Sequence, residues 1–328
     1  MRFKITTLCA FCVLTGTAAS ADVDQAARDV IGPAYRDFAE AATALDQAAQ
    51  VDCSAAALQA PYQAAWDAWA SIDYFQLGPV EQGGRALAVS FWPDKKSSGQ
   101  RAQQALIDAN APVIDDLEAF ATVSVAARGL SGMERLLYQP GVEGDEDVLC
   151  RMRRATATDL ARTAAEIAAD WPDFEGSLTT AGAPENSRYL APVEARQALY
   201  TQLVTGLDHL AEVRLGRPIG TPEKPRPDAA EARAAGRSLR NVALSLQGMR
   251  DLAMALRPEA QKARAAFDKA IAEAEALDDP VFEGVADPDG RKRALAVERA
   301  VWSAKLAVES DIGEALGLSV GFNSKDGD

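Results

Sequence analysis

Apolar side chains recur along this chain at intervals of three and four residues, which is the spacing of one face of an α-helix. Two stripes are clear in the first quarter of the chain: Tyr35, Phe38, Ala42 and Leu45, and then Leu58, Tyr62, Trp66, Trp69 and Ile72. No segment alternates convincingly with the period of two that marks a β-strand. The pattern therefore predicts an all-α protein.

Proline and glycine divide the rest of the chain into further helical segments. These are predicted at 106–120 with a break at Pro112, and at 125–138, 147–171, 192–215, 229–256, 258–277 and 291–316. Residues 172–191 are rich in Gly, Pro, Ser and Thr and have no clear period, which suggests a domain boundary. Residues 217–227 hold four prolines and predict an extended connection.

The predicted helices fall into two sets of about four. We expect two up-and-down four-helix bundles related by approximate internal symmetry. The stretches GLSGMERLLYQPG and GLDHLAEVRLGRPIG, one in each set, both start with Gly-Leu and end in a Pro/Gly turn. The expected division is a signal peptide at 1–21, an N-terminal bundle at 22–180 and a C-terminal bundle at 181–328.

The first residues have the three parts of a secretory signal peptide. Arg2 and Lys4 precede an apolar run at 5–14, and Ala19-Ser20-Ala21 provides a cleavage site. The run is too short to cross a bilayer as a helix; a buried N-terminal helix is the alternative. We expect cleavage after Ala21, a periplasmic protein, and no transmembrane segment after removal of the leader.

Export changes the interpretation of the cysteines. Cys9 and Cys12 leave with the leader, so that Cys53 and Cys150 remain. A pair of cysteines in an oxidising compartment predicts one disulfide, here closing a loop of about 100 residues. The alternative, two metal-binding thiols, has no histidine nearby to support it.

Composition and net charge restrict the fold class and the kinds of ligand that this chain is expected to have. The chain is 48% hydrophobic but 6% aromatic, which favours packed helices. The net charge of −14 becomes −16 when Arg2 and Lys4 are removed with the leader. A protein this acidic does not bind nucleic acid through its overall field, whereas it attracts cations weakly.

Hydrolytic chemistry has few residues to draw on. His209 is the single histidine of the chain, whereas a zinc hydrolase normally uses three protein ligands, mostly His, and a general base. The sequence has no H-E-x-x-H, no P-loop and no dinucleotide-binding fingerprint. The composition argues against most hydrolase classes.

Four blocks of sequence, in order, resemble the imelysin-like family of exported all-helical proteins, which are linked to iron uptake and named after a proposed metallopeptidase. They are YQAAWDAWASIDYFQLGPVE (62–81) with FWPDK (91–95), ARGLSGMERLLY (127–138), PRPDAAEARAAGRSLRNVALSLQGM (225–249) and LGLSVGFNSKDGD (316–328). Together they span nearly the whole mature chain. The resemblance implies two helical bundles with a cleft between them and a G-x-H-x-x-E motif near that cleft.

The motif falls on Gly129, Ser131 and Glu134 of this chain. In the family pattern His and Glu lie three residues apart, project from one helix face and can reach one cation. Ser131 stands at the histidine position, and a hydroxyl is a much poorer ligand for iron, copper or zinc. The residues expected to bind a ligand in the cleft are Gly129, Ser131, Glu134, Arg135 and Trp92.

Two interpretations of the charged residues stay open. His209 and Glu212 form an H-x-x-E pair, so Glu134, His209 and Glu212 are a candidate set for iron or another divalent metal ion if the halves are symmetric. Alternatively, Glu134 pairs with Arg128 or Arg135 as a structural link, and His209 is an ordinary exposed or hydrogen-bonded histidine. No cofactor is certain from the sequence.

Three functions follow. The first is a non-catalytic periplasmic binding or accessory component of iron or metal acquisition. The second is a module that holds a small ligand, peptide or protein partner, with its metal site lost; other periplasmic iron-uptake proteins are candidate partners. The third is a metallopeptidase, against which the lone His209 and the hydroxyl of Ser131 both count.

Overall fold

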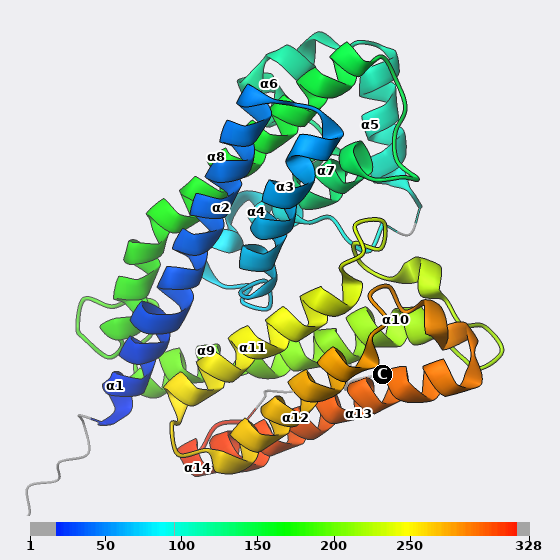
Figure 1. Cartoon of the computed structure of the whole chain (residues 1–328). Helices are drawn as coiled ribbons and strands as arrows, with labels where there is room; N and C mark the ends of the chain where they lie inside the picture. Colours follow the sequence, from blue (N-terminus) through cyan, green and yellow to red (C-terminus); the bar gives the residue numbers. More distant parts are fainter. Residues whose placement is uncertain (1–17, 95, 320–328) are drawn as a thin grey trace, which may run out of the picture.

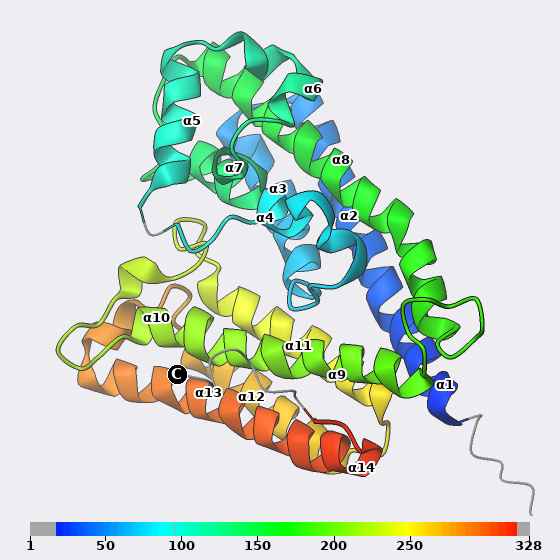
Figure 2. The same ribbon diagram turned by 180° about the vertical axis from the view of Figure 1, so that it is seen from behind.

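The protein is built from α-helices (Figure 1), as its apolar period predicts. The computed structural model describes residues 18–94 and 96–319, and within them it contains no β-strand, only a single bridge between Thr221 and Lys224. The helices gather into two groups whose long axes are steeply inclined to each other in both views (Figures 1 and 2).

The first half packs four helices in a ring of neighbours. They are α2 (Gly32–Val51), α3 (Ala55–Ala70), α7 (Gly129–Leu137) and α8 (Glu146–Thr179), with the shorter α4 (Arg85–Val89), α5 (Ser98–Asp108) and α6 (Leu117–Phe120) beside them. α2 packs on α3 and α8, and α7 packs on the same two helices. Each of the four helices therefore packs against two of the others.

The second half repeats this arrangement with different helices. They are α9 (Pro192–His209), α11 (Ser238–Leu256), α12 (Gln261–Leu277) and α13 (Pro288–Val308), with the short α10 (Gly216–Ile219) and α14 (Glu314–Leu316). α11 packs on α9 and α12, and α13 packs on the same two helices (Figure 2). The internal symmetry and the domain boundary at residue 180 stay predictions.

Several predicted boundaries differ from the structure. In place of the helix predicted at 106–120, α5 begins earlier, at Ser98, and ends at Asp108, and α6 covers only Leu117–Phe120. α8 continues through Pro172 to Thr179 because Trp171, Phe174 and Leu178 are buried, so that tertiary packing outweighs the lost N–H bond at the proline. The predicted helix at 125–138 is interrupted before α7. α11 begins nine residues later than predicted, at Ser238, because residues before it make polar contacts with α7 and η6 (Leu210–Leu215). Ala235 donates its N–H to Glu134, and Glu231 pairs with Arg214.

The described chain begins in contact with the second half. α1 (Ala18–Gln25) packs on α9 and α11, and the guanidinium of Arg196 in α9 binds the Asp22 carboxylate through two hydrogen bonds, of 2.5 and 3.0 Å. Most of the predicted signal peptide lies at 1–17, outside the described residues. Within the described ranges, no helix combines the length and the apolar character that a membrane span requires.

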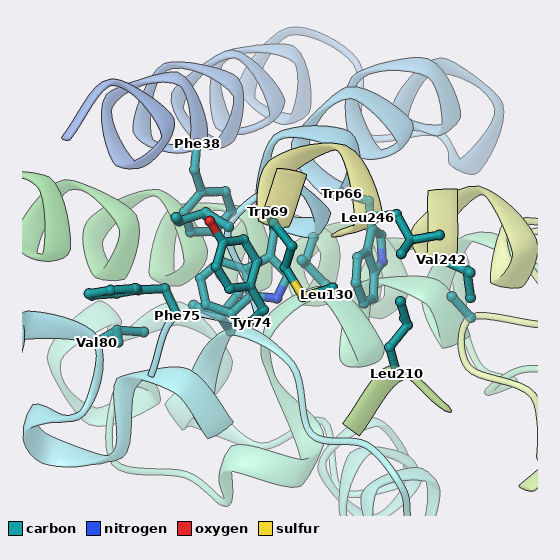
Figure 3. Packing of buried hydrophobic residues seen from close by; sticks show 14 of the residues in the cluster. Phe38, Trp66, Trp69, Tyr74, Phe75, Val80, Leu130, Leu210, Val242 and Leu246 are labelled. Atoms are coloured by element: carbon teal, nitrogen blue, oxygen red, sulfur yellow. The ribbon is translucent and has the colours of Figure 1, made fainter. Parts of the chain in front are cut away.

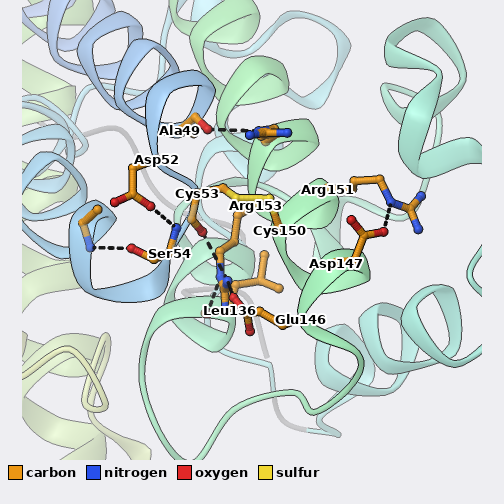
Figure 4. Close-up of a disulfide and its surroundings, with 12 residues drawn as sticks. Ala49, Asp52, Cys53, Ser54, Leu136, Glu146, Asp147, Cys150, Arg151 and Arg153 are labelled. Carbon is orange, nitrogen blue, oxygen red and sulfur yellow. Dashed lines mark hydrogen bonds and ion pairs between the residues drawn. A yellow bond between two sulfur atoms is a disulfide. The ribbon is translucent and has the colours of Figure 1, made fainter.

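The predicted disulfide is confirmed (Figure 4). Cys53 in the α2–α3 turn is bonded to Cys150 in the second turn of α8, with their Cα atoms 5.2 Å apart. The Arg153 guanidinium lies behind the bridge and donates to the carbonyl of Cys53 at 3.2 Å and to that of Leu136 at 3.1 Å. The bridge and Arg153 together therefore connect the α2–α3 turn, α7 and α8.

The two halves share one hydrophobic cluster (Figure 3). Trp66 and Trp69 of α3 lie beside Val242 and Leu246 of α11. The close approach of α11 to the turn that follows α3 depends on Gly248 of α11. A Cβ atom at this position would lie 1.8 Å from the carbonyl oxygen of Ser71. The contact is fixed by Tyr74, whose hydroxyl donates to the Gly248 carbonyl at 3.0 Å.

A methyl group at Gly248 is expected to push the halves apart. Gly248→Ala should lower the free energy of unfolding by about 1–3 kcal/mol, because its neighbour is a backbone carbonyl that cannot rotate away. Gly176→Ala in α8 is the matched control, because its Cβ meets nothing within 4 Å; there the change should be neutral or stabilising by up to about 1 kcal/mol. Urea unfolding of both variants measures the difference, and equal curves would show that the contact is not tight.

Candidate functional site

A cavity of about 390 Å³ lies where the two halves meet. The first half contributes the end of α3, the turn at 71–74 and the segment from α4 to Trp92; the second half contributes α9, α11 and the residues between them. The volume falls in the range of small-molecule sites. Because both halves form its walls, any relative motion of the halves changes its shape.

A buried ion cluster forms the floor of the cavity. Arg214 pairs with Asp73 and, at 3.1 Å, with Glu231, and all three side chains are at most 8% exposed. The Ser245 hydroxyl donates to Asp73 at 3.1 Å, and the Asn241 amide donates to Glu231 at 3.1 Å. Since Asp73 belongs to the first half and its partners to the second, the cluster joins the halves electrostatically.

A π-helical turn explains why Arg214 faces the cavity. α9 passes without a break into η6 (Leu210–Leu215), in which hydrogen bonds run from residue i to i+5. This geometry stacks residues five apart, so His209 and Arg214 both line the cavity. In a regular α-helix, residues five apart point in different directions.

The cavity perturbs its ionisable groups. Burial raises the pKa of Asp73 to about 6, against the opposing effect of Arg214, and the nearby Glu231 carboxylate adds to the rise. Desolvation and, to a smaller degree, the charge of Arg214 lower the pKa of His209 to about 4, although the residue also reaches the surface. Within the described lining, the acidic side chains are Asp73 and Glu231, and the guanidinium is that of Arg214.

The motif Gly129-x-Ser131-x-x-Glu134 lies behind one wall of this cavity. Gly129 starts α7 with φ +65°, and a Cβ there would lie 2.1 Å from the carbonyl oxygen of Ala88, so glycine allows α7 to begin directly against α4. Ser131 is buried, and its hydroxyl lies 3.4 Å from that of Ser90, which lines the cavity. The serine is thus one side chain removed from the cavity.

Glu134 and Arg135 hold loops in place. Glu134 accepts a hydrogen bond from the backbone N–H of Ala235 at 3.0 Å and thereby ties α7 to the second half. Burial raises its pKa, and the Ala235 N–H opposes that rise. Arg135 donates to the Gln103 amide oxygen at 2.9 Å and to the Ala126 carbonyl at 2.5 Å.

The alternative in which Glu134 pairs with Arg128 or Arg135 does not appear as an ion pair among the described residues. Arg128 binds Asp159 at 2.8 Å instead, and among the described residues Arg135 forms no ion pair with its neighbour. The motif glutamate is a link between the halves, but it acts through a backbone N–H of the second half.

The structure does not bring Glu134, His209 and Glu212 together. Across 18–94 and 96–319, no three His, Cys, Asp or Glu side chains are placed to hold one metal ion. His209 and Glu212 are both exposed, His209 at the end of α9 and Glu212 in the π-turn η6. These residues do not fit a bound metal ion.

Trp92 does line the cavity, and its ring lies 5.8 Å from the guanidinium carbon of Arg217. The sequence interpretation missed the ion cluster of Asp73, Arg214 and Glu231. A signal was present, because each stands in an apolar or alanine-rich run (SIDYF, VRL, AAEAR), where a charge is rare unless it is paired.

Most of the chain is similar to known proteins. A family model described as Imelysin, peptidase group M75, matches residues 31–304. A curated relative, iron-regulated protein A from Synechococcus elongatus (strain ATCC 33912 / PCC 7942 / FACHB-805), is 27% identical over 244 residues. The match takes in 70% of this chain and 62% of the relative, so the chain spans less than two thirds of that protein's length.

Two solved structures share the fold. A crystal structure of an imelysin-like protein from Psychrobacter arcticum 273-4 matches with a TM-score of 0.79 and 18% identity, over 94% of this chain and 98% of that one. A crystal structure described as an iron-regulated protein A precursor from Parabacteroides distasonis ATCC 8503 matches with a TM-score of 0.64 and 15% identity, over 91% and 96%. At these identities the similarity concerns the fold.

Proposed function

The chain belongs to the imelysin family, and from that premise we propose that it is an exported, non-catalytic binding component of iron or metal acquisition that holds its ligand in the cavity between its halves. The observation that carries this proposal is the cavity itself: both halves wall it, and a buried ion cluster with Arg214 at its centre forms its floor. Small-molecule sites are usually pre-formed cavities, largely apolar, with a few placed polar groups.

Three further features support the proposal. The matched relative is named for its regulation by iron. The leader with its cleavage site after Ala21 supports periplasmic export. The net charge of −14 for the whole chain favours cationic or metal-bearing ligands over anions.

A hydrolytic role has less support from the geometry. The Glu134 carboxylate is engaged by the Ala235 N–H, and the neutral His209 has no pair of carboxylates arranged with it as metal ligands in the described chain. We therefore derive no metal-dependent step. The ligand of the cavity, whether a metal-bearing molecule, another small molecule or a peptide segment, is held rather than cleaved.

Filling the cavity is expected to abolish function without disturbing the ion cluster. Ala86 is partly buried on α4 and lines the cavity, so Ala86→Trp places an indole in the ligand space. In a host lacking its own copy, this variant should fail to restore growth under iron limitation. The control Ala272→Trp, on the exposed face of α12, should restore it fully. Loss of the gene without any iron-dependent growth defect would refute the link to iron.

A further inference from the structure

The lining of the cavity carries one carboxylate more than it can neutralise. Asp73 and Glu231 are both buried there, and Arg214 is the one guanidinium among the lining residues. His209, the remaining basic group of the lining, is neutral at pH 7 because its pKa is lowered. Among the described residues of the lining, the two acidic side chains therefore outnumber the one guanidinium.

A surplus buried charge is costly unless something pairs with it. The groups that face Asp73 are Arg214 and Glu231 from the second half and Tyr35 and Tyr74 from the first. Burial and, to a smaller degree, the Glu231 carboxylate raise the pKa of Asp73 to about 6, so a proton competes for this carboxylate below that pH. A positively charged ligand would pair with the ionised carboxylate.

The uncharged part of the lining also suits an organic cation. Trp69, Tyr74 and Trp92 line the same cavity, and aromatic faces attract ammonium groups. The hydroxyls of Ser90 and Thr205 and the amide of Gln202 add acceptors for N–H donors. Asp73 and Glu231 keep spare acceptor capacity, because a carboxylate offers about four lone-pair sites.

We propose that the cavity binds a small organic amine, with a primary ammonium group seated against Asp73 and Glu231 and its carbon chain against the Trp69 and Trp92 rings. This inference rests on the proposed binding function and specifies its ligand class. A bare metal ion fits less well, because the described residues offer no set of three metal-ligating side chains. Any link to iron then runs through an amine-bearing molecule.

Three five-carbon probes test the charge preference on the mature chain: 1,5-diaminopentane, 1,5-pentanediol and glutarate, titrated by calorimetry. We expect the diamine alone to bind. Because binding favours ionised Asp73, whose pKa is about 6, affinity should be about tenfold weaker at pH 5 than at pH 7.5. Fe(II) and Zn(II) salts, each titrated alone, serve as the metal probes.

Asp73→Asn should remove most of the diamine affinity and its pH dependence. Asp67→Asn is the control, because Asp67 binds Arg237 and Arg240 and does not line the cavity. If Asp73→Asn does not fold, the pH dependence of diamine binding to the native chain tests the role of Asp73 instead. Binding of glutarate, equal binding of the diol, or one Fe(II) or Zn(II) per chain without diamine binding would each overturn the inference. In each of these cases, failure of Ala86→Trp to restore growth under iron limitation would still support the proposed function.

Discussion

Arg214→Met should lower the free energy of unfolding by about 3–5 kcal/mol at pH 7.5, the largest effect expected of any single substitution in the cavity lining. Methionine fills much of the space of the arginine stem but leaves Asp73 and Glu231 buried without a counter-charge. Because the cluster joins the halves, the loss should appear as weaker docking of the two as well as lower stability. Urea unfolding followed by tryptophan fluorescence measures it.

The pH dependence of this loss identifies its cause. Burial already raises the pKa of Asp73 to about 6, and removing Arg214 raises it further. A carboxyl with a raised folded pKa stabilises the fold at low pH and loses that contribution as pH rises through the folded value. The deficit of Arg214→Met should therefore be smaller at pH 5 than at pH 7.5.

A triple variant separates charge from packing. Adding Asp73→Asn and Glu231→Gln to Arg214→Met removes all three charges and keeps the shapes of the side chains, so stability should recover most of the loss. A single variant that costs under about 1 kcal/mol, or a triple variant no better than the single one, would mean that the cluster does not hold the halves together.

The helical class and the disulfide could be predicted from the sequence because each depends on local or countable features. The stripes from Tyr35 to Leu45 and from Leu58 to Trp69 are buried as their spacing indicates. The ends of α8 and α11 could not be predicted, because contacts distant in sequence decide them. Phe174 and Leu178 are buried beyond the internal proline Pro172, and Ala235 gives its N–H to Glu134.

The candidate site could be predicted only in part for the same reason. Trp92 and His209 do line the cavity, while Glu134 is drawn away by a backbone N–H from the other half. The place of Arg214 depends on a π-turn, which no residue pattern at α-helical spacing reveals. Charged residues inside apolar runs were the usable signal, because burial there requires a partner.

Loss of the disulfide should have an effect of similar size, through the unfolded chain. Cys53 and Cys150 are 97 residues apart, and a closed loop of that length is worth about 4–5 kcal/mol in chain entropy. Replacing both cysteines by serine should therefore lower the melting temperature by on the order of 10 °C. Differential scanning calorimetry of oxidised wild type and variant measures the shift.

Reduction provides the internal control for this prediction. Dithiothreitol should move the melting temperature of the wild type to that of the double-serine variant and leave the variant unchanged, since both cysteines lie in the bridge. The destabilisation should centre on the first half, where the bridge holds the α2–α3 turn to α8 and Arg153 joins Cys53 to the end of α7 (Figure 4). Amide exchange that quickened equally in α12 and α13 would show instead that the two halves unfold as one unit, and two titratable thiols in the native protein would contradict the bridge itself.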